Sequence, residues 1–324
     1  MKFLAVVKSV KAKTLLVSLP NNLIVSVSAK DINDRFKDLA MKESTENDSD
    51  DSDDDEEEPL SSLVPDLRDT FRENQFLPCI LTNFFTTAKG KKRISASINP
   101  SVVNGHTDSF VQNQVLTANI ASVEDHGYVL DLGLGKRAFM PFSESEGPLL
   151  VNQGCMIQVV DVEGSGLVQA KLLDFSSSAS DHISANLDSF ESFIPGMLVK
   201  GKVKAVTESN VQVTIEKVFN GYINYFHFGF PVLDEQILGQ TFAVGKQIRV
   251  SVIYVDPISR KLGLSLNPWV LNPSVSNVSD LMGSVFDDFE ILKHDVNWIQ
   301  STSAKAQSIP CFIHASLKFL HNLQ

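Results

Sequence analysis

The chain has 324 residues, 43% of them hydrophobic and 21% charged, which is enough for two or three globular domains with ordinary cores. Its formal net charge of −11 disfavours nucleic-acid binding, but the charge is unevenly distributed. Eleven of its 39 acidic residues lie between Glu43 and Glu58, and the remaining 28 balance the 28 Lys and Arg residues. No apolar run reaches about 18 residues, and lysines interrupt the apolar start before it is long enough for a secretion signal. We therefore expect a soluble intracellular protein with no membrane partner.

The strands that the sequence predicts fall into three stretches with one plan, each recognised by alternating apolar and polar residues between Gly and Asn turns. In chain order, the first stretch has strands at 3–10, 14–19, 23–28, 76–81 and 93–98. The second has strands at 115–123, 127–132, 137–142, 157–162 and 167–172. The third has strands at 194–206, 211–215, 221–225, 244–256 and 262–266.

Five short strands in each stretch, with one long connection before the fourth, favour closed five-stranded barrels, since closure removes exposed sheet edges. Generic β-sandwich domains are the alternative. We therefore expect an all-β chain of tandem five-stranded OB-fold barrels joined by short linkers. The expected domains are 1–99, 109–175 and 194–268, with a linker at 176–193 that includes a serine-rich spacer.

The acidic segment Glu43–Glu58 lies inside the first domain, between its third and fourth strands. It contains too few apolar residues to bury a core, so we expect it to be a disordered insert. It is interpreted as a solubilising loop. Alternatively, it engages basic ribosomal proteins or repels RNA from the first barrel, an effect that salt would screen.

Three cysteines, Cys79, Cys155 and Cys311, are far apart and show no metal-ligand spacing. We expect buried free thiols in a reducing compartment. The sequence also lacks a phosphate-binding Gly-Lys-Ser/Thr loop, a GxSxG elbow and an HExxH motif. We therefore expect no enzymatic activity, no cofactor, no metal and no small-molecule substrate.

Two segments of the third stretch resemble the S1-type RNA-binding repeat. The opening has Gly196 and Gly201 followed by Val203, in the pattern Gly-x-x-x-x-Gly-x-Val, and the closing segment Val255–Leu266 carries the pattern Val-Asp-x-x-x-Arg-Lys-Leu-x-Leu-Ser-Leu. In the second stretch, Val123–Tyr128 and Arg137–Pro141 are similar to the ribosomal RNA-processing protein 5 family. The resemblance covers about residues 1–298 of this sequence.

The resemblance implies a non-catalytic scaffold of the nucleolus that binds single-stranded precursor ribosomal RNA and ribosome-assembly proteins. That family consists of much longer proteins with many such repeats. Residues 281–298 look like the start of a fourth repeat, and residues 299–324 do not match. We interpret the chain as a truncated or mis-spliced gene model, with a genuine short isoform as the alternative.

The second repeat carries the best match to the family's RNA-binding positions. Tyr128 and Phe139 stand where the repeat family has stacking aromatics, and Lys136 and Arg137 are placed to meet phosphates. Core packing is the alternative for both aromatic residues. Pro141 stands where many family members have a histidine, so no imidazole is available there to contact RNA.

The third repeat is a partial match. Tyr222 matches the third-strand aromatic, and Arg260 and Lys261 match the basic pair after the last turn, whereas Asn210 departs from the second-strand aromatic position. Asp256 is interpreted as a turn cap rather than an RNA contact. The aromatic run Tyr225–Phe230 packs in the core or forms an exposed stacking patch.

The first repeat is predicted to be a poor RNA reader. Val25 and Ser26 stand where the repeat family has Gly and an aromatic residue, and only Lys89–Arg93 provides a basic patch. Protein binding is at least as well supported for this repeat. For the whole chain, a protein-interaction scaffold with weak or lost RNA affinity, or an S1-repeat translation or transcription factor, remains the alternative.

Overall fold

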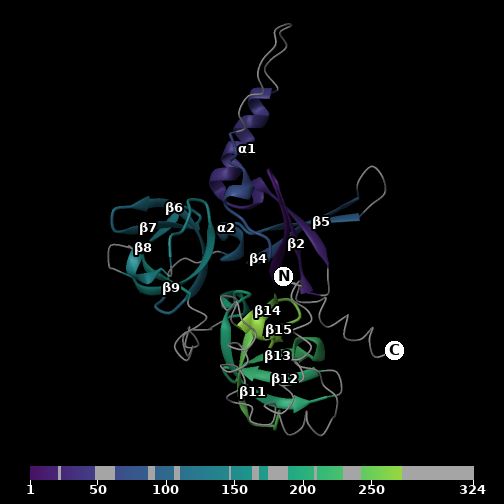
Figure 1. Ribbon diagram of the computed structural model, residues 1–324. Helices are drawn as coiled ribbons and strands as arrows, with labels where there is room; N and C mark the ends of the chain where they lie inside the picture. Colours follow the sequence, from purple (N-terminus) through teal and green to yellow (C-terminus); the bar gives the residue numbers. More distant parts are fainter. Residues whose placement is uncertain are drawn as a thin grey trace, which may run out of the picture. The chain divides into compact units, whose positions relative to one another are not determined.

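The computed structural model describes residues 1–20, 23–47, 63–86, 92–105, 110–145, 147–162, 168–173, 189–207, 210–228 and 242–271. The chain divides into two compact units, one made mainly of residues 4–172 and the other mainly of the residues from 173 onward. The first unit contains two barrels and the second contains one (Figure 1).

Each barrel is built from five strands. The first barrel has β1 (Lys2–Lys11), β2 (Thr14–Ser18), β3 (Ile24–Ser28), β4 (Phe76–Thr86) and β5 (Lys92–Ser97). The second has β6 (Val115–Glu124), β7 (Gly127–Gly133), β8 (Lys136–Pro141), β9 (Gly154–Val162) and β10 (Val168–Leu172). The third has β11 (Leu198–Val206), β12 (Asn210–Ile215), β13 (Phe219–Asn224), β14 (Gln247–Asp256) and β15 (Lys261–Ser265).

One order of strand pairing recurs in all three barrels. The first three strands form an antiparallel meander, the third pairs in parallel with the fifth, and the fourth pairs with both the fifth and the first. This order closes the sheet of each barrel into a ring. The prediction of tandem five-stranded OB-fold barrels is confirmed.

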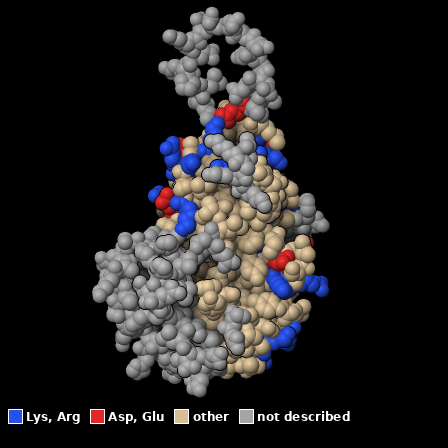
Figure 2. All heavy atoms as spheres, turned by 90° about the vertical axis from the view of Figure 1, so that its right-hand side faces the viewer, with Lys and Arg blue, Asp and Glu red and all other residues tan. Residues whose placement is uncertain are grey.

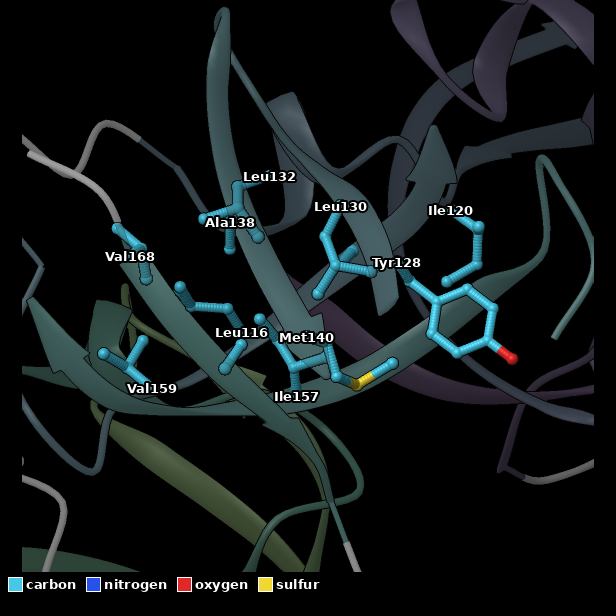
Figure 3. Close-up of a cluster of buried hydrophobic side chains, with 12 residues drawn as sticks. Leu116, Ile120, Tyr128, Leu130, Leu132, Ala138, Met140, Ile157, Val159 and Val168 are labelled. Carbon is cyan, nitrogen blue, oxygen red and sulfur yellow. The ribbon is translucent and has the colours of Figure 1, made fainter. Parts of the chain in front are cut away.

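Alternation along the strands places one set of side chains in each core. In β12, for example, Val211, Val213 and Ile215 are buried, and Gln212 and Thr214 between them are partly exposed. The core of the second barrel combines side chains from all five strands, and ten of them are labelled in Figure 3. Period-two alternation is what a half-buried antiparallel strand requires, so this pattern made the strands predictable.

The described part of the chain contains three helices and several 3-10 turns. They are α1 (Asp34–Asn47), α2 (Pro100–Val103) and α4 (Pro268–Leu271), with 3-10 turns η2 (Ala29–Asp31), η3 (Leu67–Asp69), η4 (Phe142–Glu144), η6 (Phe190–Ser192) and η7 (Tyr225–His227). Asn33 starts α1 because its Oδ1 accepts a hydrogen bond from the Phe36 backbone N–H at 2.7 Å. The Phe36 ring is fully buried, which holds the start of the helix against the folded part of the chain.

The acidic insert is only partly as predicted. Residues 43–47 form the last turn of α1 rather than disordered chain, and the Glu43 carboxylate lies 2.6 Å from Lys13 Nζ. Helix formation continues into the insert because α1 has already started at a capped, buried position, so later residues need no new nucleation. Residues 48–58 of the insert, the serine-rich spacer, residues 281–298 and the tail at 299–324 lie outside the described residues.

Within the first unit, a chain of hydrogen bonds connects the start of α1 to the β7–β8 turn of the second barrel. Asp34 accepts hydrogen bonds from the Asn99 amide at 2.7 Å and from the Ser101 hydroxyl at 2.5 Å. The Ser101 hydroxyl oxygen in turn accepts one from the Leu134 backbone N–H at 2.9 Å. Burial acts to raise the pKa of Asp34, but these hydrogen bonds outweigh it and the pKa is lowered.

Asn104 completes the same junction. Its side-chain amide donates to the backbone carbonyls of Thr117 and Leu132 and accepts from the Thr117 backbone N–H and hydroxyl, at 2.8 to 3.0 Å. Both polar ends of the amide are therefore paired where α2 meets β6 and β7. The residues between the first two barrels thus form a specific junction as well as a linker.

Cys79 and Cys155 are free thiols, and burial raises the pKa of each to about 12. Cys311 lies outside the described residues. In the described part of the chain, no three His, Cys, Asp or Glu side chains group to hold a metal ion, and no helix is long and apolar enough to cross a membrane.

The junction can be tested at Gly133, whose φ is +86° and whose added Cβ would lie 2.2 Å from the Ser101 backbone nitrogen. We expect Gly133→Ala to lower the free energy of unfolding by more than about 2 kcal/mol, because both backbone strain and a backbone clash oppose it. Denaturant unfolding followed by circular dichroism measures the change.

Gly135→Ala is the matched control for this test. Gly135 also has a positive φ, +72°, but a Cβ there meets no atom within 4 Å. Its cost should therefore be limited to the left-handed conformation, about 1 kcal/mol. Equal losses for the two variants would contradict a close contact between Gly133 and α2.

Candidate nucleic-acid interface

The third strands of the second and third barrels each present an aromatic side chain at the same position of the fold. Phe139 on β8 lies opposite Gln169 on β10, and Tyr222 on β13 lies opposite Gly263 on β15. Both rings are half-buried on the outer side of the sheet, between inward-facing neighbours. Such a ring offers a face for base stacking without disturbing the core.

Gly127 makes room for the Phe139 ring. A Cβ at Gly127 would lie 2.8 Å from the Phe139 Cζ and 2.3 Å from the Met140 carbonyl oxygen. A larger residue would displace the ring and the strand together. The glycine that the repeat family has before its second-strand aromatic is therefore explained here by the outer aromatic across the sheet.

In the third barrel the structure brings a cation to the aromatic residue. Lys261 Nζ lies 5.9 Å from the centroid of the Tyr222 ring, although the two residues are far apart in the sequence. A cation over a ring face is attracted by its quadrupole, and its remaining N–H groups can bind a phosphate. Tyr222 and Lys261 are thus brought together.

Tyr254 belongs to the same outer surface, although it matches none of the motif positions in the sequence. Tyr254 on β14 lies opposite Gly263, and a Cβ built on Gly263 would fall 1.9 Å from its ring. The ring therefore covers the glycine. Desolvation by burial, with further contributions from Asp256 and Tyr222, raises the pKa of Tyr254 above its ordinary value. A glycine in a strand, flanked by two tyrosine-bearing strands, is the sequence signal that could have identified it.

Tyr128 is placed differently from the other predicted aromatics. Only 4% of its surface is exposed, its hydroxyl accepts a hydrogen bond from the Leu149 backbone N–H at 3.1 Å, and its ring meets Phe142 edge to face at 5.0 Å. Figure 3 shows the ring at one end of the core, with the hydroxyl pointing away from the other labelled side chains. Core packing, the alternative considered for Tyr128, accounts for this geometry, and a stacking role does not.

The predicted basic residues of the second barrel point in different directions. Lys136 Nζ lies 5.0 Å from the Phe110 ring centroid, whereas Arg137 is exposed, lies opposite Asp131 in the register of β7 and β8, and is two residues from Phe139 on the same side of β8. Desolvation raises the pKa of Asp131, and Arg137 opposes that shift. Arg137 therefore remains a candidate phosphate contact on the Phe139 face, and Lys136 does not share that face.

The last turn of the third barrel has the predicted cap. Asp256 Oδ1 accepts hydrogen bonds from the backbone N–H groups of Ile258 and Ser259, at 3.1 and 3.2 Å. Arg260 is exposed in this turn with a φ of +53°, next to Lys261. The cap holds the turn, so Arg260 at its end and Lys261 at the start of β15 take fixed positions.

A row of lysines on the third barrel also lies outside the motif positions. Lys200, Lys202 and Lys204 are exposed at alternate positions of β11, and Lys200 lies opposite Arg249 on β14. The alternation of lysines with apolar residues in this segment is the sequence signal that could have identified the row. On the face drawn in Figure 2, Lys and Arg side chains lie in several separate patches.

The aromatic run after β13 is partly an exposed patch and partly core. Tyr225 and Phe226 are exposed and their ring centroids lie 3.9 Å apart, whereas Phe228 is buried and contacts Phe242 at 5.2 Å. Burial lowers the pKa of His227, between them, so the neutral imidazole is favoured. Phe230 lies outside the described residues.

Tyr128→Phe tests the core assignment. Removing the hydroxyl leaves the Leu149 N–H without this acceptor, so we expect the free energy of unfolding to fall by about 1 kcal/mol. RNA affinity should stay unchanged at temperatures where the variant is folded. A loss of affinity without a loss of stability would return Tyr128 to the interface.

The relatives found by sequence comparison are proteins of the kind that the motifs resemble. No protein-family model matches the chain. It is 27% identical over 310 residues to a mouse protein named "Protein RRP5 homolog", and 29% identical over 308 residues to an Arabidopsis thaliana protein named "rRNA biogenesis protein RRP5". These alignments cover 90% and 91% of this chain but only 16% and 15% of the relatives, so the chain spans about a sixth of their length.

Among solved structures, a multidomain Streptococcus pneumoniae protein with nucleic acid binding domains aligns over 97% of this chain and 86% of its own. Its identity is 14% and its TM-score is 0.19, too low to support an argument from the superposition. The strand pairings therefore establish the fold independently. The resemblance to RRP5 proteins that the motifs predicted is confirmed by curated relatives from several eukaryotes.

Proposed function

We propose that this chain is a non-catalytic, RNA-binding segment of a scaffold for precursor ribosomal RNA processing and ribosomal subunit assembly. The observation that carries the proposal is the recurrence of an outward aromatic ring at one position in two barrels, with Lys261 over the ring in one of them. The names of the curated relatives support ribosomal RNA as the class of ligand.

Single-stranded RNA fits this surface better than a duplex. The rings of Phe139 and Tyr222 offer faces on which unpaired bases stack, each worth about 1–3 kcal/mol and tolerant of base identity. Lys261 lies at the Tyr222 ring and Arg137 shares the outer side of β8 with Phe139, so both would meet phosphates, and Arg260 is exposed in the turn next to Lys261. Each barrel then binds weakly, and covalent connection of the barrels raises the overall affinity by about 10² to 10⁴.

The proposal also covers protein partners and location in the cell. Ribosome-assembly proteins are the proposed protein partners and the nucleolus is the proposed location, because rRNA biogenesis is what the relatives' names state. No catalytic step is assigned, because the folded segments of the sequence carry none of the nucleophile, phosphate-loop or metal motifs tested.

A protein-interaction scaffold is the second candidate, and one observation favours it for the first repeat. Val25 is buried there and the Ser26 hydroxyl donates to the Ile94 carbonyl at 3.4 Å, so this barrel has no outward aromatic at the corresponding strands. A translation or transcription factor with the same repeat is less well supported, because the relatives' names specify rRNA biogenesis.

We expect Phe139→Ser and Tyr222→Ser in the whole chain each to weaken binding of a labelled oligouridine by about fivefold or more, because each removes one stacking ring. Fluorescence anisotropy measures the dissociation constant, and thermal unfolding checks the fold. Val160→Ser, an exposed apolar residue on β9, is the control and should leave affinity unchanged. Equal affinities for all three variants would refute the interface.

Lysine contacts with phosphates are tested separately by salt dependence. Replacing Lys200, Lys202 and Lys204 together by Gln should reduce the slope of log affinity against log salt by about 0.7 for each phosphate that these lysines neutralise. Lys37→Gln, an exposed lysine on α1, is the control. An unchanged slope would mean that the β11 row is only solvated.

A further inference from the structure

The β4–β5 hairpin of the first barrel extends beyond the barrel. In the barrel, β5 pairs with β3 at Ser95, and the pairing of β4 with β5 continues beyond this residue as far as Thr86 opposite Lys92. The end of β5 projects from the barrel in Figure 1. The register shifts between Leu81 and Asn83, and such a bulge bends the strand and increases its twist. The two strands beyond the Asn83–Ser95 pair are named the hairpin arm, residues 84–86 and 92–94.

Two phenylalanines of the hairpin arm are unusually exposed. Phe84 is 72% exposed and Phe85 is 45% exposed. They are consecutive in β4, so they point to opposite sides of the hairpin arm: Phe84 lies opposite Ile94 and Phe85 lies opposite Arg93. An isolated hairpin is marginally stable in water, and exposed rings add nothing to a hydrophobic core. The presence of two large apolar rings on the hairpin arm is therefore not explained by stability.

Charge on this part of the chain has one sign. From Asn74 to Thr107 the sequence contains four basic residues and no acidic residue, although the whole chain has a net charge of −11. Arg93 is exposed directly across from Phe85. A ring with a guanidinium beside it can stack on a base through either group while the cation meets a phosphate.

The other hairpin of this type described in the structure is different. In the third barrel, β14 and β15 are joined by the short turn that Asp256 caps, and the exposed Ile258 is the apolar residue at its tip. The first barrel has the longest β4-type strand and lacks an outward aromatic on its second and third strands. Its exposed aromatics are instead on the hairpin arm.

We propose that the hairpin arm is a second type of single-stranded RNA-binding site, in which Phe84 and Phe85 stack on unpaired bases and Arg93 contacts a phosphate. This inference rests on the proposed RNA-binding function and assigns part of it to the repeat that matches the RNA-binding motif least. In OB folds generally, the loop between the fourth and fifth strands contributes to oligonucleotide binding, which is consistent with this position.

RNA is favoured over a protein occupant by the combination of features. A protein-binding patch is enriched in aromatic residues within a packed, desolvated centre, whereas these rings project on both sides of a narrow ribbon. A base can stack on either side of such a ribbon, and the absence of acidic residues over 34 positions, 74 to 107, removes repulsion from a phosphate backbone.

The test compares oligouridine binding by the whole chain and by Phe84→Ser/Phe85→Ser. We expect the double variant to bind at least about fivefold more weakly, because at least one stacked base is lost. Both rings are exposed, so the melting temperature should not fall. Val218→Ser is the matched control, because Val218 is 73% exposed on the third barrel, and it should bind like the unmodified chain.

Arg93→Gln tests the phosphate contact. The slope of log affinity against log salt should fall by about 0.7, whereas Arg35→Gln on α1, also exposed, should leave it unchanged. Together, the two experiments separate stacking from charge at the hairpin arm.

The outcomes distinguish this inference from the proposed function. If Phe139→Ser and Tyr222→Ser weaken RNA binding but the hairpin-arm variants do not, the inference fails and the function stands. If the unmodified chain does not bind oligouridine at low salt, both fail. Normal RNA binding by the Phe84→Ser/Phe85→Ser variant, with loss of a captured ribosome-assembly protein, would make the hairpin arm a protein site and overturn the inference.

Discussion

Barrel closure is the constraint on which the rest of this structure depends. The parallel pairing of the third strand with the fifth, together with the pairing of the fourth with the first, closes each sheet into a barrel and pairs its backbone groups. It also decides which distant residues become neighbours. Tyr222 meets Gly263 and Lys261, and Phe139 meets Gln169, only because those two strands lie side by side. The candidate interface is thus a product of closure.

Closure leaves the outer surface and the strand connections free to differ between repeats. The second and third barrels use that freedom for an outward aromatic ring, and the first uses it for a helix, α1, and for the hairpin arm. The junction through Asp34, Ser101 and Leu134 adds a fixed relation between neighbouring elements of the first unit. Similar cores therefore support repeats with different surfaces, and in the proposed function their contributions to RNA binding are unequal.

The strands could be predicted from the sequence because a half-buried strand alternates apolar and polar residues with a period of two, a pattern that neighbouring residues alone reveal. The sequence predicted less of the site. Tyr128 follows a glycine in the motif that marks a stacking aromatic, but its burial depends on Leu149 and Phe142, which lie in the connection after β8. Tyr254 required knowledge that β14 and β15 are paired at Gly263. Helix α1 depends on the burial of Phe36, a tertiary contact that overrides an acidic, weakly apolar segment.

The most direct measurement of the central claim is ultraviolet cross-linking of the whole chain to oligouridine, followed by mass spectrometry of the modified peptides. The account predicts adducts on the peptides that carry Phe139, Tyr222 and Phe84–Phe85, with none on Tyr128, since that ring lies in the core. Adducts confined to peptides outside the β8, β13 and hairpin-arm segments, or modification of Tyr128 in the folded protein, would contradict it.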